Sequence, residues 1–155
     1  MDLGHLFTRF DGRINRAQCW PGAIVLGIVS LVVLYGSIFA GGGSIHDQDT
    51  RARTITLAVQ LVFLYPLAAL MVKRLHDRNR PGYFAAFILV PVVLKGVTDV
   101  MGLTGDALNP KALDYVFIGT VGVVGIWFFV DLGCLRGTAG PNKHGPDPLG
   151  GAPAR

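Results

Sequence analysis

The fold is decided by the stretch WPGAIVLGIVSLVVLYGSIFA at residues 20–40, in which no side chain carries a charge. A helix needs about 20 apolar residues to cross roughly 30 Å of hydrocarbon, because lipid offers no hydrogen-bond partner to a backbone amide. The stretch has this length, and Trp20 stands where an interfacial aromatic ring is expected. It is also longer than the apolar region of about 7 to 15 residues in a secretory signal peptide. We therefore predict a first membrane span at residues 20–40.

Three more stretches meet the same criterion of apolar length. The uncharged run TITLAVQLVFLYPLAALMV predicts a second span at residues 54–72. Residues 82–94 alone rise only ~20 Å, so the third span must continue past Lys95 and Asp99 to residue 101. The fourth runs from Tyr115 past Asp131 to about residue 135. The predicted fold is all-α, a four-helix integral membrane bundle that forms one domain over residues 1–155 and ends in an irregular tail at 136–155.

Composition narrows the classes of function. The chain is 51% hydrophobic and 15% charged, with a mean hydropathy of +0.48, whereas soluble domains carry about a quarter charged residues. Two cysteines are too few for a disulfide scaffold. Because the sequence contains no Walker loop, GxSxG elbow, HExxH motif or dinucleotide fingerprint, we predict no catalytic residue, metal site or cofactor, and a non-enzymatic protein is favoured.

The basic residues indicate the orientation. Of the 14 Lys and Arg residues, ten precede the first span, lie between the second and third, or follow the fourth. The other connections hold Arg51, Arg53 and Lys111, and Lys95 lies within the third span. Since short basic loops resist translocation, both termini and the connection between the second and third spans are predicted to be cytoplasmic. The net charge of +4 is then explained by topology and by contact with anionic lipid, so no nucleic acid partner is expected.

Three polar segments are predicted to share the cytoplasmic face: FDGRINRAQCW at residues 10–20, KRLHDRNRPGY at 73–83 and RGTAGPNKHGPDP at 136–148. In the first, Arg13 and Arg16 are spaced to share a helical side, where they either clamp a phosphate or reach out to lipid headgroups. In the second, His76 and Asp77 are expected in a short loop. Asp77 either bridges arginines and caps the third span, or orients His76 for acid–base work on a lipid headgroup.

The third segment is rich in proline and glycine, so it is expected to be a shaped turn that folds back onto the middle segment. Asn142 and Asp147 would then hydrogen-bond Arg13, Arg74 or Arg80 and close a polar cap. The cap either binds an anionic headgroup or phosphorylated metabolite, or only latches the helices. The candidate ligand-binding residues are Arg13, Arg16, Arg74, His76, Asp77, Arg80, Asn142 and Asp147.

Ionisable residues within the spans suggest an alternative function. Lys95 and Asp99 are four residues apart, so a salt bridge on one helical side is expected. Asp131 is expected to pair with Lys73, Arg74 or Arg136. Lys95, Asp99 and Asp131 either line an ion or proton pathway of a small transporter, or lie at headgroup level.

The three polar segments also carry a family resemblance over nearly the whole chain. The pattern F-x-G-R-x-x-R-x-x-aromatic-W is matched over residues 10–20, with Cys19 at the aromatic position. R-R-L-H-D and R-S-G-W correspond to residues 73–77 and 80–83, and G-T-x-G-x-N-x-[YF]-G-x-D-P to 137–148, with His144 at the aromatic position. On these motifs the chain resembles the bacterial inner-membrane family called domain of unknown function 805, or the YhaH family. The resemblance implies a small multi-helix inner-membrane protein with cytoplasmic motifs, and it implies no reaction.

The predicted function is therefore a binding or partner protein of the inner membrane, with a cytoplasmic cap for an anionic lipid headgroup or phosphorylated ligand. Its expected partners are the lipid bilayer and either a second copy of the chain or another membrane protein. A transporter using the three ionisable residues within the spans, and an interfacial enzyme using His76 and Asp77, stay as alternatives.

Overall fold

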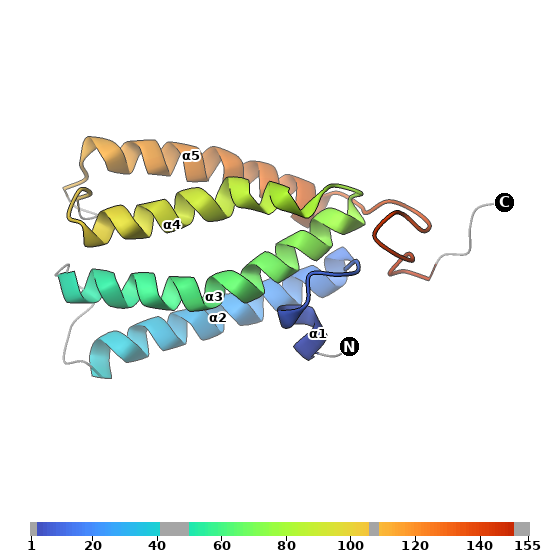
Figure 1. Cartoon of the computed structure of the whole chain (residues 1–155), viewed down its shortest axis with the longest axis horizontal. Helices are drawn as coiled ribbons and strands as arrows, with labels where there is room; N and C mark the ends of the chain where they lie inside the picture. The colour runs from blue at the N-terminus through green and yellow to red at the C-terminus, as the bar shows by residue number, and fades with distance from the viewer. Residues whose placement is uncertain (1–2, 41–49, 106–108, 151–155) are drawn as a thin grey trace.

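The computed structural model describes residues 3–40, 50–105 and 109–150, and this part of the chain is all-α (Figure 1). The connection predicted at residues 41–49, and Arg155, lie outside it. The helices are α1 (Leu3–Thr8), α2 (Arg16–Ala40), α3 (Thr50–Asp77), the short 3-10 helix η1 (Gly82–Ala85), α4 (Ala86–Val100), α5 (Ala112–Phe128) and the π-helical turn η2 (Phe129–Cys134).

Four helical stretches are long and apolar enough to cross a membrane: 16–40, 50–77, 82–100 and 112–134. The four predicted spans are confirmed by these criteria, but the boundaries differ. Helix α2 begins at Arg16, and α3 runs on to Asp77 rather than ending at residue 72. His76 and Asp77 are therefore in the last turn of a helix, and the prediction that they lie in a loop was wrong.

The spans pack in chain order, α2 on α3, α3 on α4 and α4 on α5, and η2 returns against α2 and α3. The α2–α3 and α4–α5 hairpins therefore meet at one end of the molecule. Figure 1 shows that the N-terminal segment and the C-terminal tail lie at this end, where α3 turns into α4. We call it the cap end, and the end that holds the α4–α5 connection the opposite end.

Most of the apolar surface faces outward, and the buried clusters are small. One contains Leu75, Ala85, Phe128 and Leu132, and the other contains Leu6, Ile14 and Leu70. Exposed valine, leucine, isoleucine and phenylalanine side chains cover the outer faces of all four spans. This distribution suits a lipid environment, in which an outward apolar side chain carries no hydration cost.

Helices α3 and α4 approach closely at Gly96. A Cβ built on Gly96 would lie 2.7 Å from Gln60 Oε1 and 2.9 Å from Leu57 Cδ1. Gln60 Nε2 donates a hydrogen bond of 2.9 Å to the Val92 carbonyl, which ties α3 to α4 at this point. The contact joins the two hairpins in the half of the spans nearer the opposite end.

Candidate functional site

The cap end is built around one carboxylate that joins two arginines. Asp77, in the last turn of α3, accepts hydrogen bonds from Arg13 at 3.0 Å and from Arg74, which is one turn earlier on the same helix. All three side chains are almost fully buried. The predicted role of Asp77 as a bridge between arginines is confirmed, but no side chain caps η1, the start of the third span.

Backbone carbonyls satisfy the remaining donors of the two arginines. Arg13 donates to the Thr138 carbonyl at 2.6 Å and to the Gly140 carbonyl at 2.8 Å. Arg74 donates to Leu132 at 2.7 Å and to Leu135 at 2.6 Å, so it holds η2 and the start of the tail. Two guanidinium groups share one carboxylate, which leaves this buried cluster with excess positive charge.

The tail folds back onto the end of α3, as predicted. The Thr138 amide donates to the Asp77 carbonyl at 2.8 Å, and Asn142 Nδ2 donates to the His76 carbonyl at 2.9 Å. Gly137 allows this approach, because a Cβ there would lie 1.9 Å from Asp77 Oδ2. We use the name polar cap for Arg13, Arg74, Asp77 and tail residues 137–147.

Arg13 and Arg16 do not share a helical side, because α2 begins only at Arg16 and Gly12, with φ of +84°, turns the chain just before Arg13. Arg13 consequently turns inward to Asp77, whereas Arg16 stays exposed and donates to the Cys134 carbonyl at 2.6 Å. The prediction that they share a helical side was therefore wrong, and the two guanidinium groups have different partners.

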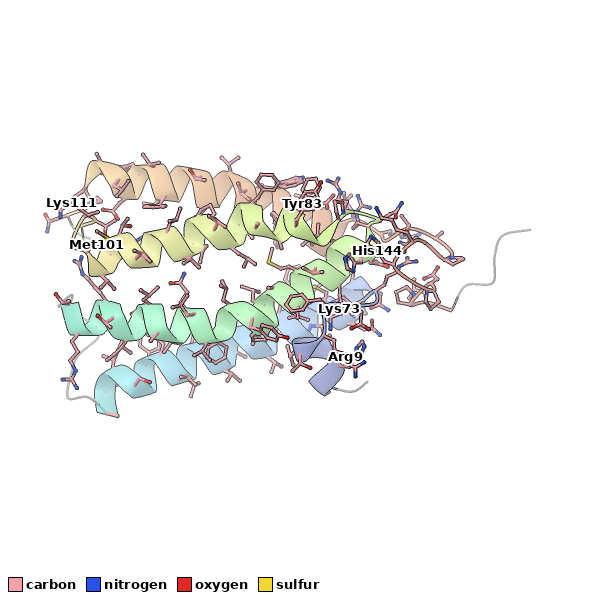
Figure 2. All side chains as sticks on the ribbon, viewed as in Figure 1. Arg9, Lys73, Tyr83, Met101, Lys111 and His144 are labelled. Atoms are coloured by element: carbon pink, nitrogen blue, oxygen red, sulfur yellow. The ribbon has the colours of Figure 1, made fainter. Side chains whose placement is uncertain are left out.

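Lys73 joins the cap to α1, a helix that was not predicted from the sequence. Its ammonium group is fully buried and donates to the carbonyls of His5 and Leu6 in α1, at 2.5 and 2.6 Å. These carbonyls belong to a helix of only six residues, whose length and composition give no clear helical signal. Figure 2 shows Lys73 and Arg9 at the cap end beside α1.

A cavity of about 360 Å³ opens beside the polar cap. Its lining includes Arg16 from α2, Arg74 and Asp77 from α3, and Arg136 and Asp147 from the tail. Arg136 is exposed, and its guanidinium group makes no hydrogen bond or ion pair with the described residues. Arg136 was not among the predicted ligand-binding residues, although it is the first residue of the third polar segment and could have been included on that ground.

Asp147 contributes a negative charge to the same cavity, but its oxygens are committed. They accept the amides of Gly140 at 2.9 Å and Leu149 at 3.0 Å. These two backbone hydrogen bonds lower the pKa of Asp147, with burial opposing them and the charge of Arg13 assisting. Asp147 therefore shapes the tail and does not contact Arg13, Arg74 or Arg80 directly.

His76 stacks on His144 of the tail, with ring centroids 3.8 Å apart and planes 7° from parallel (Figure 2 labels His144). His76 Nδ1 lies 3.2 Å from the Gly12 carbonyl, and Asp77 points away to the two arginines. Asp77 thus does not orient His76, and the arrangement lacks the carboxylate–imidazole contact that the enzyme alternative requires. Burial lowers the pKa of His144, and the nearby cationic groups of His76, Lys143 and Arg13 lower it further.

Asp131 pairs with Arg78 at 3.3 Å and with Arg80 at 3.1 Å. The predicted partners Lys73, Arg74 and Arg136 were wrong, because Lys73 turns to α1, Arg74 turns to Asp77, and Arg136 stays exposed. The Arg80 guanidinium lies 5.7 Å from the Trp127 ring, against α5. Arg80 therefore braces η2 and does not line the cavity.

Lys95 and Asp99 form the predicted salt bridge, at 2.8 Å, and Asp114 lies 3.7 Å from the same ammonium group. This cluster is at the opposite end, with the α4–α5 connection that Met101 and Lys111 mark in Figure 2. Asp131 follows Asp114 by 17 residues, which is ~25 Å along a helix. The three residues of the transporter alternative are therefore not together. Asp114, which accepts the amides of Gly105 and Lys111, was missed.

Nothing in residues 3–40, 50–105 and 109–150 groups three or more His, Cys or Asp side chains in a way that would hold a metal ion. Cys19 and Cys134 are free thiols.

Comparison with known proteins gives one family and two groups of relatives. The family model described as "Protein of unknown function (DUF805)" matches residues 7–146. The uncharacterized protein YiiR of Escherichia coli (strain K12) is 32% identical over 151 residues, which cover 95% of this chain and 90% of YiiR. The inner membrane protein YhaI of the same strain is 25% identical over 146 residues, which cover 94% and 91% of the two chains. No solved structure gives a significant match. With the four candidate spans, these likenesses identify an inner-membrane protein.

Proposed function

The chain belongs to the DUF805 family of proteins of unknown function, and we propose that its cap end faces the cytoplasm and binds a phosphate-bearing anion. The observation that carries the proposal is a cavity lined by two exposed arginines, Arg16 and Arg136, above a buried cluster of excess positive charge.

The distribution of basic residues supports the cytoplasmic orientation. The cap end holds Arg9, Arg13, Arg16, Lys73, Arg74, Arg78, Arg80, Arg136 and Lys143, whereas the other end holds Arg51, Arg53, Lys95 and Lys111. Positively charged short segments stay on the cytoplasmic side during insertion. The cavity then opens toward the cytoplasm and the inner leaflet.

Two guanidinium groups in one cavity favour an anion with several oxygens. Each presents a planar fork of N–H donors that matches phosphate, and Arg16 uses only Nη1 on the Cys134 carbonyl. Arg13 and Arg74 donate their hydrogen bonds to Asp77 and to backbone carbonyls, so they contribute positive charge near the cavity without binding the anion directly. A volume of about 360 Å³ is at the lower end of the range of small-ligand sites, ~300–1,000 Å³.

The phosphate has two possible sources, an anionic lipid headgroup and a soluble phosphorylated metabolite. Purified full-length protein would be titrated with dioleoyl phosphatidylglycerol in one arm and with glycerol 3-phosphate in the other, and binding read by native mass spectrometry. Each lost charge-assisted hydrogen bond costs about 1.5–3 kcal/mol, so we expect Arg16→Ala with Arg136→Ala to weaken binding at least about tenfold.

The matched control is Arg9→Ala with Lys143→Ala, which removes the same charge from the same end at exposed residues outside the cavity. We expect it to change binding less than about twofold, because distant exposed charges are screened by salt. Equal losses in the two double variants, or no loss in either, would contradict the proposed site.

A further inference from the structure

An apolar groove of about 430 Å³ runs between α2, α3 and α4. It is lined by six residues of α2 between Ala23 and Leu34, by six of α3 between Thr56 and Leu67, and by Val92 of α4. All of them lie within the candidate membrane spans. The function proposed above does not use this groove.

The few polar side chains of the groove are satisfied within their own surroundings. Ser30 donates to the Gly27 carbonyl at 2.8 Å, Thr56 to the Ala52 carbonyl at 2.9 Å, and Gln60 to the Val92 carbonyl at 2.9 Å. Each of these side chains donates a hydrogen bond within the protein, and the other lining side chains are apolar, so the groove favours a hydrocarbon occupant.

The groove continues the helix faces that carry the cationic cavity. On α2, Arg16 precedes Ala23 by seven residues and Ser30 by 14, and on α3, Arg74 follows Leu67 by seven and Gln60 by 14. Residues seven apart on a helix differ by only ~20° in direction, so both arginines lie on the groove-lining faces. Arg16 and Ala23 are ~10 Å apart along the axis of α2. The positive charge lies at the cap end, and the apolar groove begins seven residues farther into the span. This arrangement matches a molecule with an anionic head and an apolar tail.

The groove suits one hydrocarbon chain better than a second helix. Ala23 and Leu34 are ~16 Å apart along α2, so the volume of about 430 Å³ corresponds to a mean cross-section of about 26 Å². A helix 10–12 Å across occupies roughly 80–110 Å². The surrounding medium along the groove is bilayer, which supplies acyl chains at high concentration.

Building on the proposed function, we infer that the anion is a membrane phospholipid, with its phosphate at Arg16 and Arg136 and one acyl chain in the groove between α2, α3 and α4. The site would thus distinguish a lipid from a soluble phosphate by its tail.

Two glycines of α2 provide a matched test. A Cβ on Gly27 or on Gly36 meets nothing within 4 Å, so neither Gly27→Leu nor Gly36→Leu clashes at its Cβ, but only Gly27 lines the groove. Because an acyl chain in lipid is already in an apolar medium, the groove adds packing contacts only. We expect Gly27→Leu to weaken retention of dioleoyl phosphatidylglycerol about threefold to tenfold and to leave glycerol 3-phosphate binding unchanged, with Gly36→Leu altering neither.

Equal lipid retention by Gly27→Leu and Gly36→Leu would overturn the inference while leaving the proposed function intact, and failure of the Arg16 and Arg136 test would remove both. The unaltered protein supplies a second readout if Gly27→Leu does not fold. It should bind dioleoyl phosphatidylglycerol at least about threefold more tightly than dihexanoyl phosphatidylglycerol, whose tails are too short to reach down the groove. Equal affinity for the two lipids would also overturn the inference.

Discussion

Asp77 is the residue on which the cap end depends. Its carboxylate is almost fully buried and joins Arg13, from the segment before α2, to Arg74 of α3, while its backbone carbonyl accepts Thr138 of the tail. A buried charge whose partner is removed loses its compensation and is strongly destabilising. The three polar segments therefore meet at a single residue, through its side chain and its backbone carbonyl.

The first prediction concerns this carboxylate. Asp77→Asn leaves two buried guanidinium groups without a counter-charge, so we expect a loss of about 3–5 kcal/mol in the free energy of unfolding. Thermal unfolding in detergent, followed by the loss of helical signal, measures the change. Asp11→Asn, at a side chain that is 70% exposed, serves as the control and should shift the midpoint little. Equal midpoints for the two variants would refute the central role of Asp77.

The second prediction concerns His144, whose pKa burial and neighbouring cationic groups lower. At a pH between the two pKa values, a histidine whose pKa is lowered by folding is neutral in the folded state and protonated in the unfolded state. Its stabilising contribution is therefore present above the unfolded pKa of ~6.5 and is lost as the pH falls through the folded value. We expect the tail to become more sensitive to protease between about pH 7.5 and pH 5.5.

The control for the second prediction is His144→Phe, which keeps a ring against His76 and removes one titrating group. The pH dependence of tail cleavage should be weaker in this variant, because the phenyl ring of residue 144 cannot take up a proton as the pH falls. An unchanged pH dependence would assign the effect to another histidine.

Among the elements, the membrane spans could be predicted and their ends could not. Apolar length is a local property, so 20–40 or 54–72 can be recognised as a span without knowing its neighbours. Where α3 ends depends on distant partners. It continues to Asp77 because Arg13, His5 and Leu132 supply groups for its last polar turns, and these contacts join residues some 60 positions apart.

For the candidate site, the location could likewise be predicted and the details could not. The motifs placed the three segments at one end, but the pairing of individual arginines required the structure. Asp131 illustrates the reason, since Arg74 was a plausible partner by position and is instead committed to Asp77. Arg136 was missed because it is available to a ligand only if no other residue of the protein pairs with it, and the sequence does not show which arginines are paired.

Glycine placement gives the third prediction, at the level of helix packing. Gly119, Gly122 and Gly125 line α5, but a Cβ at any of them meets no described atom within 4 Å, whereas a Cβ at Gly96 would collide with Gln60 and Leu57 of α3. We expect Gly96→Leu to separate α3 from α4 and to cost about 1–3 kcal/mol or more in the free energy of unfolding.

Gly122→Leu is the control for this prediction, because its side chain enters open space beside α5. Thermal unfolding of the two variants in the same detergent compares them directly. A Gly96→Leu protein as stable as the Gly122→Leu protein would show that α3 and α4 tolerate a larger separation than the contact distances indicate.

At the scale of the whole molecule, most of the buried side chains lie toward one end. The two buried hydrophobic clusters and the buried charged network lie toward the cap end, and the α2–α3 and α4–α5 hairpins are joined there by η2. The opposite end is closed separately by Lys95, Asp99 and Asp114. The two helical hairpins contact each other at Gly96 and through Arg53 and Asp99 as well, but the polar end structure is where a ligand contact would affect both hairpins.

The central claim is that the N-terminal segment, the end of α3 and the tail share one surface on the cytoplasmic side. Its most direct test is labelling of intact cells with a membrane-impermeant maleimide, using single substitutions Arg9→Cys, Lys143→Cys and Arg51→Cys in a Cys19→Ser, Cys134→Ser background. Arg9→Cys and Lys143→Cys should be labelled only after the inner membrane is permeabilised, and Arg51→Cys without permeabilisation. Labelling of Arg9→Cys and Lys143→Cys from different sides would contradict the shared surface, and labelling of both from outside would contradict its orientation.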